Sequence, residues 1–194
     1  MNKIMIATSN EHKVHEFKEM LAPLGFEVTS LLDLDQAIEI EETGTTFEEN
    51  ALIKARAIHE LLKIGVIADD SGLAVDAMDG APGVYSARFL GRDTSYDIKN
   101  RYIIKQCDNH KRGAQFVCAI AYVDEKGHEE VFTGIVNGLI AEDMIGDNGF
   151  GYDPIFYYEP YHTTLANVSD ELKNKVSHRG KAIEKLIAYM EVAK

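Results

Sequence analysis

The sequence is poor in positive charge relative to negative charge. Its 20 Lys and Arg are outnumbered by 32 Asp and Glu, which gives a formal net charge of -12. Proteins that bind nucleic acid or anionic membranes nonspecifically need clustered cations to displace counterions from phosphates. The charge therefore argues against a nucleic-acid polymer or a membrane as the partner, although a few local cations could still bind a small anionic ligand.

Long apolar runs and cysteine are also scarce. No segment approaches the roughly 20 apolar residues of a membrane helix, and the first residues lack the pattern of a secretion signal. We therefore expect a cytoplasmic protein. The two cysteines, Cys107 and Cys118, lack zinc-type spacing and sit in apolar stretches, which predicts reduced core residues.

Linkers, repeats and low-complexity segments are absent as well, so we expect a single domain over residues 1–194. The order of elements indicates an α/β fold, and two lobes around one extended sheet would fit it. Strands are predicted at 3–7, 26–31, 66–68, 115–123 and 130–140, with the last two forming a long hairpin. One helix is predicted from the apolar stripe of Val14, Phe17, Leu21 and Leu24, and a second runs from a cap at Thr46 to Leu62. Two more helices are predicted over 94–107 and 178–192.

Two adjacent carboxylates, Asp69 and Asp70, follow the apolar run 65–68. That run predicts a short buried strand, so the pair is expected at its carboxyl end, where α/β sheets place ligand sites. Asp, Ser and Gly are also the common turn residues, so the segment 69–72 could equally cap a turn. The segment alone leaves both interpretations open.

The loop 7–13 leaves the first predicted strand and opens a helix. Its free backbone N–H groups, the helix dipole, the short side chains of Thr8, Ser9 and Asn10 and the Lys13 ammonium suit a phosphate. The glycine-rich phosphate loop is missing, and Ser9 or Asn10 could simply cap the helix.

A third segment, 39–51, places several carboxylates before and within a helix. A solvated acidic face is the usual explanation. That interpretation explains Lys54 poorly, because this lysine lies one turn after Asn50 and could reach a phosphate.

Five motifs occur in order along nearly the whole chain. They are Thr8-x-Asn10-x-x-Lys13; Glu42-Thr43-Gly44 with Phe47-Glu48-Glu49-Asn50-Ala51 and Lys54-Ala55; Ala68-Asp69-Asp70-Ser71-Gly72-Leu73; Gly149-Phe150-Gly151-Tyr152-Asp153-Pro154; and Ser177-His178-Arg179-Gly180. Each motif is weak alone, but the ordered set resembles the inosine triphosphate pyrophosphatase family. The resemblance implies an elongated mixed α/β fold of two lobes, usually a homodimer, with the nucleotide in a cleft between the lobes.

The same resemblance implies a Mg2+-dependent nucleoside triphosphate pyrophosphatase. It would hydrolyse the noncanonical purine nucleotides ITP, dITP and XTP to the monophosphate and pyrophosphate, which keeps deaminated purines out of DNA and RNA. A Maf-like pyrophosphatase for modified pyrimidine nucleotides is one alternative, disfavoured by the motifs at 150–153 and 177–179. A nucleotide sensor that does not hydrolyse is another, disfavoured by Glu42, Asp70, Lys13 and Lys54.

Phosphate and metal binding are expected in the first half of the chain. Mg2+ commonly takes one or two protein carboxylates; we expect Glu42 and Asp70, with Asp69 and Glu41 as substitutes. By the resemblance Asp70 is also the catalytic proton acceptor, but a metal-bound carboxylate is a weak base, so it could orient the water instead and Asp69 is the alternative base. The expected substrate-binding residues here are Thr8, Ser9, Asn10, Glu11, His12, Lys13, Lys54 and Ser71.

Base recognition is expected in the second half. Phe150 offers a ring for purine stacking, and donors near a 6-keto purine would exclude ATP, although they do not exclude GTP. The expected residues are Phe150, Gly151, Tyr152, Asp153, Lys173, His178 and Arg179. A glycine-rich turn, and capping or an ion pair at the start of the last helix, are the structural alternatives. The histidines other than His178 are expected on surfaces or in polar loops, without a catalytic or metal role.

Overall fold

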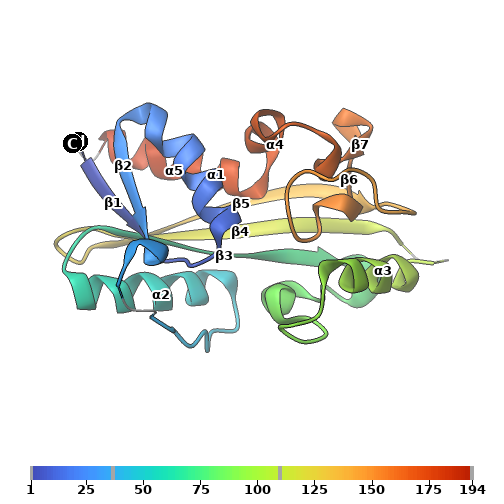
Figure 1. The fold of residues 1–194 in the computed structure, drawn as a ribbon, viewed down its shortest axis with the longest axis horizontal. Helices are drawn as coiled ribbons and strands as arrows, with labels where there is room; N and C mark the ends of the chain where they lie inside the picture. The colour runs from blue at the N-terminus through green and yellow to red at the C-terminus, as the bar shows by residue number, and fades with distance from the viewer. Residues whose placement is uncertain (1, 36–37, 109–110, 193–194) are drawn as a thin grey trace. The chain divides into compact units, whose positions relative to one another are not determined.

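The computed structural model describes residues 2–35, 38–108 and 111–192 (Figure 1). Its main helices are α1 (Glu11–Leu21), α2 (Phe47–Leu62), α3 (Tyr96–Gln106), α4 (Asp170–Val176) and α5 (His178–Val192). Its strands are β1 (Asn2–Ile6), β2 (Phe26–Ser30), β3 (Val66–Val75), β4 (Gly113–Val123), β5 (Glu129–Ile140), β6 (Phe156–Tyr158) and β7 (Thr163–Thr164). They form one sheet in the order β2-β1-β3-β4-β5-β6-β7.

The sheet is mixed. β1 runs parallel to β2 and to β3, whereas β6 runs antiparallel to β5 and to β7. The α/β class and the mixed sheet are therefore confirmed, as is the hairpin of β4 and β5 around the turn at 124–128. None of the helices in the described part of the chain combines the length and the hydropathy that a membrane span requires.

The chain divides into two compact units. Unit 1 comprises Met1–Asp70, Cys118–Gly134 and Arg179–Lys194, and unit 2 comprises Ser71–Val117 and Ile135–His178. Each unit draws on separated stretches of chain, and β3 contributes to both. The single domain over 1–194 stays a prediction.

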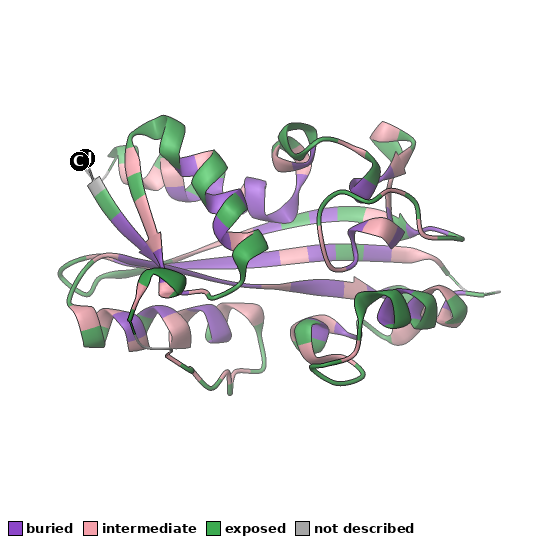
Figure 2. Cartoon of the chain, viewed as in Figure 1, coloured by how far each residue is buried: buried purple, intermediate pink, exposed green. Residues whose placement is uncertain are grey.

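The strands of unit 1 alternate between two cores. On one face Ile4, Ile6 and Ile67 pack with Phe17 of α1 and Leu186 of α5. On the other face a second core joins the strands to α2; its members include Met5, Ala7, Val66, Ala68, Ala51, Ala55 and Ile58. Figure 1 shows α1 and α5 on one side of these strands and α2 on the other, and Figure 2 shows their inner residues buried. Because consecutive strand residues point to opposite faces, neighbours in β3 meet different helices.

The start of α2 is fixed by its capping residues. The Thr46 hydroxyl accepts a hydrogen bond from the Glu49 backbone N–H at 3.1 Å, and the Glu49 carboxylate accepts one from the Thr46 N–H at 3.3 Å. This reciprocal pair confirms the predicted cap and satisfies N–H groups that the helix leaves unpaired. It also sets the rotation of the helix, so that Asn50 is buried in the first turn.

Unit 2 has a core of its own. Leu73 and Val75 of β3 pack there with Ile103 of α3, Phe116 of β4 and Phe156 of β6. Cys107 belongs to this core and Cys118 to the core of α1 and α5, and both are free, buried thiols as predicted.

The prediction for β3 is wrong in one important respect. The strand does not end at Ala68 but continues to Val75, so Asp69 and Asp70 lie in its middle and not at its carboxyl end. The turn alternative for 69–72 is wrong for the same reason. Charged residues normally interrupt a buried strand, and they are accommodated here because each carboxylate meets cationic or donor groups.

Smaller differences lie at element ends. The first helix stops at Leu21, and Leu24 belongs to a short 3-10 turn containing Pro23, where it is 50% exposed and not part of a buried stripe. The short elements β6, β7 and α4 have no counterpart in the prediction, since segments of 2 to 7 residues carry too little periodicity to be recognised.

Candidate active site

The two adjacent carboxylates of β3 have separate surroundings within unit 1. Asp69 shares the strand face of Ile67, where α1 and α5 pack, and Asp70 shares the face of Ala68, where α2 packs. Their partners differ accordingly, as the hydrogen bonds below show. The extended strand thus separates two carboxylates that a turn would have presented together.

Asp69 is the centre of a buried ion network. Its side chain is 0% exposed, and its Oδ2 atom lies 2.9 Å from Lys13 Nζ and 3.0 Å from Arg179 Nη2. Arg179 in turn donates through Nη1 to Glu16. Burial alone would raise the pKa of Asp69, but the charges of Lys13, Arg179 and Lys54 outweigh it and hold that pKa well below its usual range.

This network bears on two predicted roles. A buried carboxylate that already accepts from two cations, with a strongly lowered pKa, is poorly suited to take a proton, so the geometry does not favour Asp69 as the base. Arg179, predicted to contact substrate, is 1% exposed and holds two carboxylates. The ion-pair alternative describes what its side chain does here, and its substrate contact stays a prediction.

Asp70 faces a different set of groups. Its Oδ2 atom accepts a hydrogen bond from Asn50 Nδ2 at 3.0 Å, and its Oδ1 atom lies 3.9 Å from Lys54 Nζ. Lys54 Nζ is also 2.5 Å from Glu42 Oε1. Burial raises the pKa of Asp70, and the nearby Glu42 charge adds to that rise, while Lys54 and Lys13 oppose it. Asp70 is therefore the more basic of the two neighbouring carboxylates.

Asn50 connects this carboxylate to the acidic loop. Its Oδ1 atom accepts a hydrogen bond from the Gly44 backbone N–H at 2.8 Å, while its amide nitrogen holds Asp70. A side chain at Gly44 would collide with the same amide, since a Cβ there would lie 2.6 Å from Asn50 Oδ1. Glycine at this position lets the loop carrying Glu42 approach α2 closely.

The oxygen ligands needed for a divalent cation are present. Glu42 and Asp70 both lie within 4.0 Å of the single Lys54 ammonium, so two carboxylates converge on one cation in the structure. Mg2+ prefers such hard oxygen ligands and commonly uses only one or two of them from a protein. The residues fit a magnesium site, and a second cation would offset the repulsion by which the Glu42 charge raises the pKa of Asp70.

The predicted phosphate loop is ordered by its own side chains. Asn10 caps α1, because its Oδ1 atom accepts from the Lys13 N–H at 3.2 Å, and Thr8 Oγ1 accepts from the Asn10 N–H at 3.2 Å. The helix-cap interpretation is therefore confirmed. Ser9, Glu11 and His12 are exposed, and phosphate binding by the loop stays a prediction.

The predicted base-binding loop lies in unit 2. The Asp153 Oδ2 atom accepts hydrogen bonds from the Phe150 N–H at 2.9 Å and from Lys173 Nζ at 2.7 Å. Lys173 Nζ is also 4.8 Å from the centre of the Phe150 ring. Gly149 has a φ of +71°, and a Cβ there would lie 2.3 Å from Asp153 Oδ2. The glycine thus permits the tight turn that brings these three side chains together.

Two more predicted residues belong to this unit. His178 is 6% exposed and stacks on Phe116, with ring centres 4.7 Å apart and planes 14° from parallel. Tyr152 is 4% exposed and donates through its hydroxyl to the Ser86 carbonyl oxygen at 2.7 Å, which makes it a core anchor of the loop. Lys173 comes from α4, so the structure brings it, Phe150 and Asp153 together as predicted site residues.

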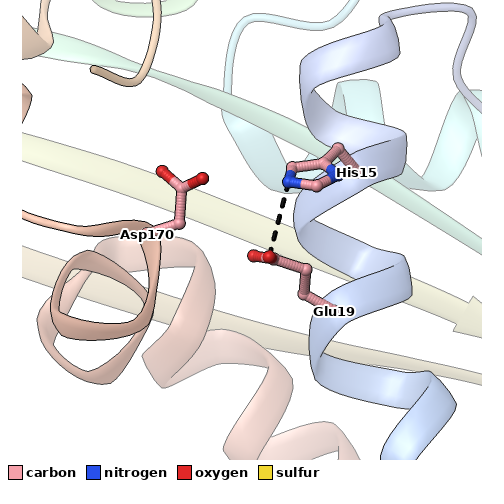
Figure 3. Close-up of side chains that lie close together, drawn as sticks. All are labelled: His15, Glu19 and Asp170. Atoms are coloured by element: carbon pink, nitrogen blue, oxygen red, sulfur yellow. Dashed lines mark ion pairs between the residues drawn. The ribbon is translucent and has the colours of Figure 1, made fainter.

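The remaining histidines were predicted on surfaces or in polar loops, and the structure describes five of them; their lack of a catalytic or metal role stays a prediction. His15 lies on the exposed side of α1, where its Nε2 atom is 3.4 Å from Glu19 Oε1, one turn along the helix (Figure 3). His12, His128 and His162 are exposed and His59 is half-buried. His110 lies outside the described residues.

Comparison with known proteins identifies the family. The profile of the Ham1 family matches residues 4–189. The chain belongs to the Ham1 family. A relative from Bacillus licheniformis named dITP/XTP pyrophosphatase is 47% identical over 197 residues, with 100% of both chains covered. A second of that name, from Listeria monocytogenes, is 46% identical over 96% of this chain and 93% of its own. The structure of the Staphylococcus aureus Ham1 protein matches with a TM-score of 0.89 at 42% identity, over 100% of both chains.

The family membership confirms the resemblance drawn from the five motifs. Within this Ham1-family chain, two residues of the site were not predicted. Glu16 lies three residues after Lys13, and Asn50 four residues before Lys54, so helical spacing already placed both beside a predicted lysine. That spacing was the available signal for each.

Proposed function

We propose that this chain is a Mg2+-dependent pyrophosphatase for dITP, ITP and XTP, releasing the monophosphate and pyrophosphate. The observation that carries the proposal is the convergence of Asp70 and Glu42 on Lys54 in a chain with full-length relatives named dITP/XTP pyrophosphatase. A carboxylate pair beside an ammonium suits the hydrolysis of a phosphoanhydride, which depends mainly on charge neutralisation and positioning.

Unit 1 would handle the triphosphate. Glu42 and Asp70 would hold Mg2+, which when bound neutralises phosphate charge and acidifies a coordinated water. Lys54 and Lys13 would bind phosphate oxygens, assisted by the loop from Thr8 to Lys13 and by Ser71, where unit 2 begins. Asp70 would orient or deprotonate the attacking water. The Asn50 hydrogen bond to Oδ2 fixes the direction of its carboxylate.

Unit 2 would read the base. The Phe150 ring would stack on the purine, and its loop is tied to Lys173 through Asp153. Lys173 and His178, together with Arg179 of unit 1, supply donors that suit the 6-keto oxygen of hypoxanthine or xanthine. The 6-amino group of adenine is itself a donor and offers them no acceptor. The same reasoning does not separate GTP from XTP.

The remaining expectations belong to the same proposal. We propose a cytoplasmic homodimer that acts as a single domain on free nucleotides and not on a nucleic-acid polymer or a membrane. The net charge of -12 supports the absence of a polyanionic partner. Light scattering of the purified protein would test the dimer.

The test of the activity is a comparison of substrates and metals. Pyrophosphate release should be fast from dITP, ITP and XTP with Mg2+. It should be at least about a hundredfold slower from dATP, because adenine offers no 6-keto acceptor to a site built from donors. It should also be slower from dGTP, as the proposed substrate class requires. EDTA should abolish the release and added Mg2+ should restore it. Separate detection of pyrophosphate and orthophosphate distinguishes cleavage between the α- and β-phosphates from cleavage between the β- and γ-phosphates.

Three outcomes of this assay would overturn the proposal. Orthophosphate in place of pyrophosphate would indicate cleavage at the wrong anhydride. Modified pyrimidine nucleotides are included in the same assay, and their faster turnover would favour the Maf-like alternative. Tight binding of dITP without turnover would favour a sensor.

The base-reading role of His178 gives a second prediction. His178→Ala is expected to lower the ratio of kcat/KM for dITP over dATP by about tenfold, because one hydrogen bond donor of the base site is removed. Inhibition by inorganic triphosphate, which has no base, should be unchanged. His128→Ala, at an exposed hairpin turn, is the matched control. An equal loss of rate with both nucleotides would refute base reading by His178.

A further inference from the structure

One face of α3 holds the loop 149–153 within unit 2. Asn100 is 2% exposed, and its Nδ2 atom donates a hydrogen bond to the Gly151 carbonyl oxygen at 3.1 Å. Tyr96, one turn earlier, packs edge-on against Tyr152 with ring centres 5.1 Å apart. Because residues i and i+4 share a helix face, both contacts come from the same stripe of α3.

Gly151 needs such an anchor. Its φ of +66° lies in the left-handed region, and it belongs to neither a helix nor a strand that would fix its carbonyl through a regular ladder. Asp153 already fixes the backbone N–H of the preceding residue, Phe150. The backbone that carries the Phe150 ring is therefore held at two points, by Asp153 at one and by Asn100 at the other.

Folding alone does not explain an asparagine at this position. Its Oδ1 atom is buried and has no hydrogen-bond partner in the part of the chain that the structure describes. An unpaired buried acceptor costs free energy comparable to what the one retained hydrogen bond contributes. A leucine of similar volume would avoid the cost, so the amide is better explained by the Gly151 carbonyl that it orients.

We propose that Asn100 is a positioning residue that sets base selectivity by fixing the Gly151 peptide and, through it, the Phe150 ring. The inference rests on the proposed base-reading function of this loop. Without the Asn100 donor, the Gly151 carbonyl loses its protein partner and turns toward solvent, and the ring is no longer held in one orientation for stacking. Phosphate binding by residues of unit 1 is not affected.

Asn100→Leu tests the proposal, with Asn100→Asp as a second variant that keeps the shape but places an acceptor against the Gly151 carbonyl. The ratio of kcat/KM for dITP over dATP should fall by about tenfold, mainly through a higher KM for dITP. Inhibition by inorganic triphosphate should be unchanged. Amide hydrogen exchange of residues 149–153 in the free enzyme should become faster. Arg101→Gln, which breaks only an exposed pair with Asp97 on the same helix, should alter none of these.

Each outcome separates this inference from the function on which it rests. If amide hydrogen exchange of 149–153 or the ratio of kcat/KM for dITP over dATP is unchanged in the variants, the role of Asn100 is wrong. The pyrophosphatase activity, which is measured on the wild-type enzyme, would be unaffected by that result. Weaker inhibition by triphosphate to the same degree would indicate general structural damage and would also overturn it. If the wild-type enzyme itself shows no preference for dITP over dATP, the proposed function is refuted instead.

Discussion

Asp70→Asn is expected to lower kcat for dITP by about a thousandfold, within the range associated with loss of a general base, while the protein remains folded. Asn50 Nδ2 can still donate to the remaining side-chain oxygen at position 70, so the local hydrogen bond persists. Burial raises the pKa of Asp70, which means that the folded state disfavours its charge. Neutralising the side chain should therefore leave the melting temperature unchanged or raise it.

Steady-state kinetics with Mg2+ and calorimetric titration of dITP check this prediction together. The dissociation constant should change far less than kcat, because Lys54, Lys13 and the base loop remain. Asp79→Asn is a matched control, since Asp79 is exposed in a turn at a φ of +50° that asparagine also tolerates. Near-normal turnover in Asp70→Asn would refute both proposed roles of Asp70, as a Mg2+ ligand and as the residue that orients or deprotonates the attacking water.

The contrast between Asp69 and Asp70 shows what the sequence could and could not predict. The ordered motifs identified the family and predicted that Glu42, Asp70 and Lys54 belong to one site. This prediction was possible because residue type and short-range spacing are visible in the sequence. The sequence did not reveal that β3 continues through both carboxylates to Val75. That length depends on β3 entering a second core, with Leu73 and Val75 in contact with unit 2 residues far away in sequence.

Arg179 illustrates the same limit at longer range. Its position at the start of the last helix was predicted, and α5 does begin at His178. Its partners, Asp69 and Glu16, are 110 and 163 residues away, and no local pattern specifies such pairs. The family resemblance therefore predicted a substrate contact, which stays a prediction, whereas the tertiary structure places the guanidinium in a buried network.

That network gives the largest expected effect on stability. Asp69→Asn should lower the free energy of unfolding by about 3–5 kcal/mol at pH 7, the usual cost of removing one partner from a buried ion pair. Lys13 would then lose the carboxylate that its ammonium contacts, and Arg179 would keep Glu16 but lose Asp69, in a buried site. Asp97→Asn removes an exposed ion pair with Arg101 and should cost less than about 1 kcal/mol.

The dependence on pH distinguishes this explanation from simple loss of packing. The pKa of Asp69 in the folded protein lies well below the ordinary value of 3.8. Its charge therefore stabilises the fold fully above that ordinary value, and the contribution is lost as the pH falls from there toward the lower pKa of the folded state. Urea unfolding of wild type and Asp69→Asn should thus show a stability gap that is constant from pH 7 to pH 5 and narrows at pH 3. If the difference in unfolding free energy is the same at pH 3 and pH 7, Asp69 contributes through packing and hydrogen bonding and not through its charge. The Lys13 ammonium would then not need a buried counter-charge to hold its position for binding phosphate.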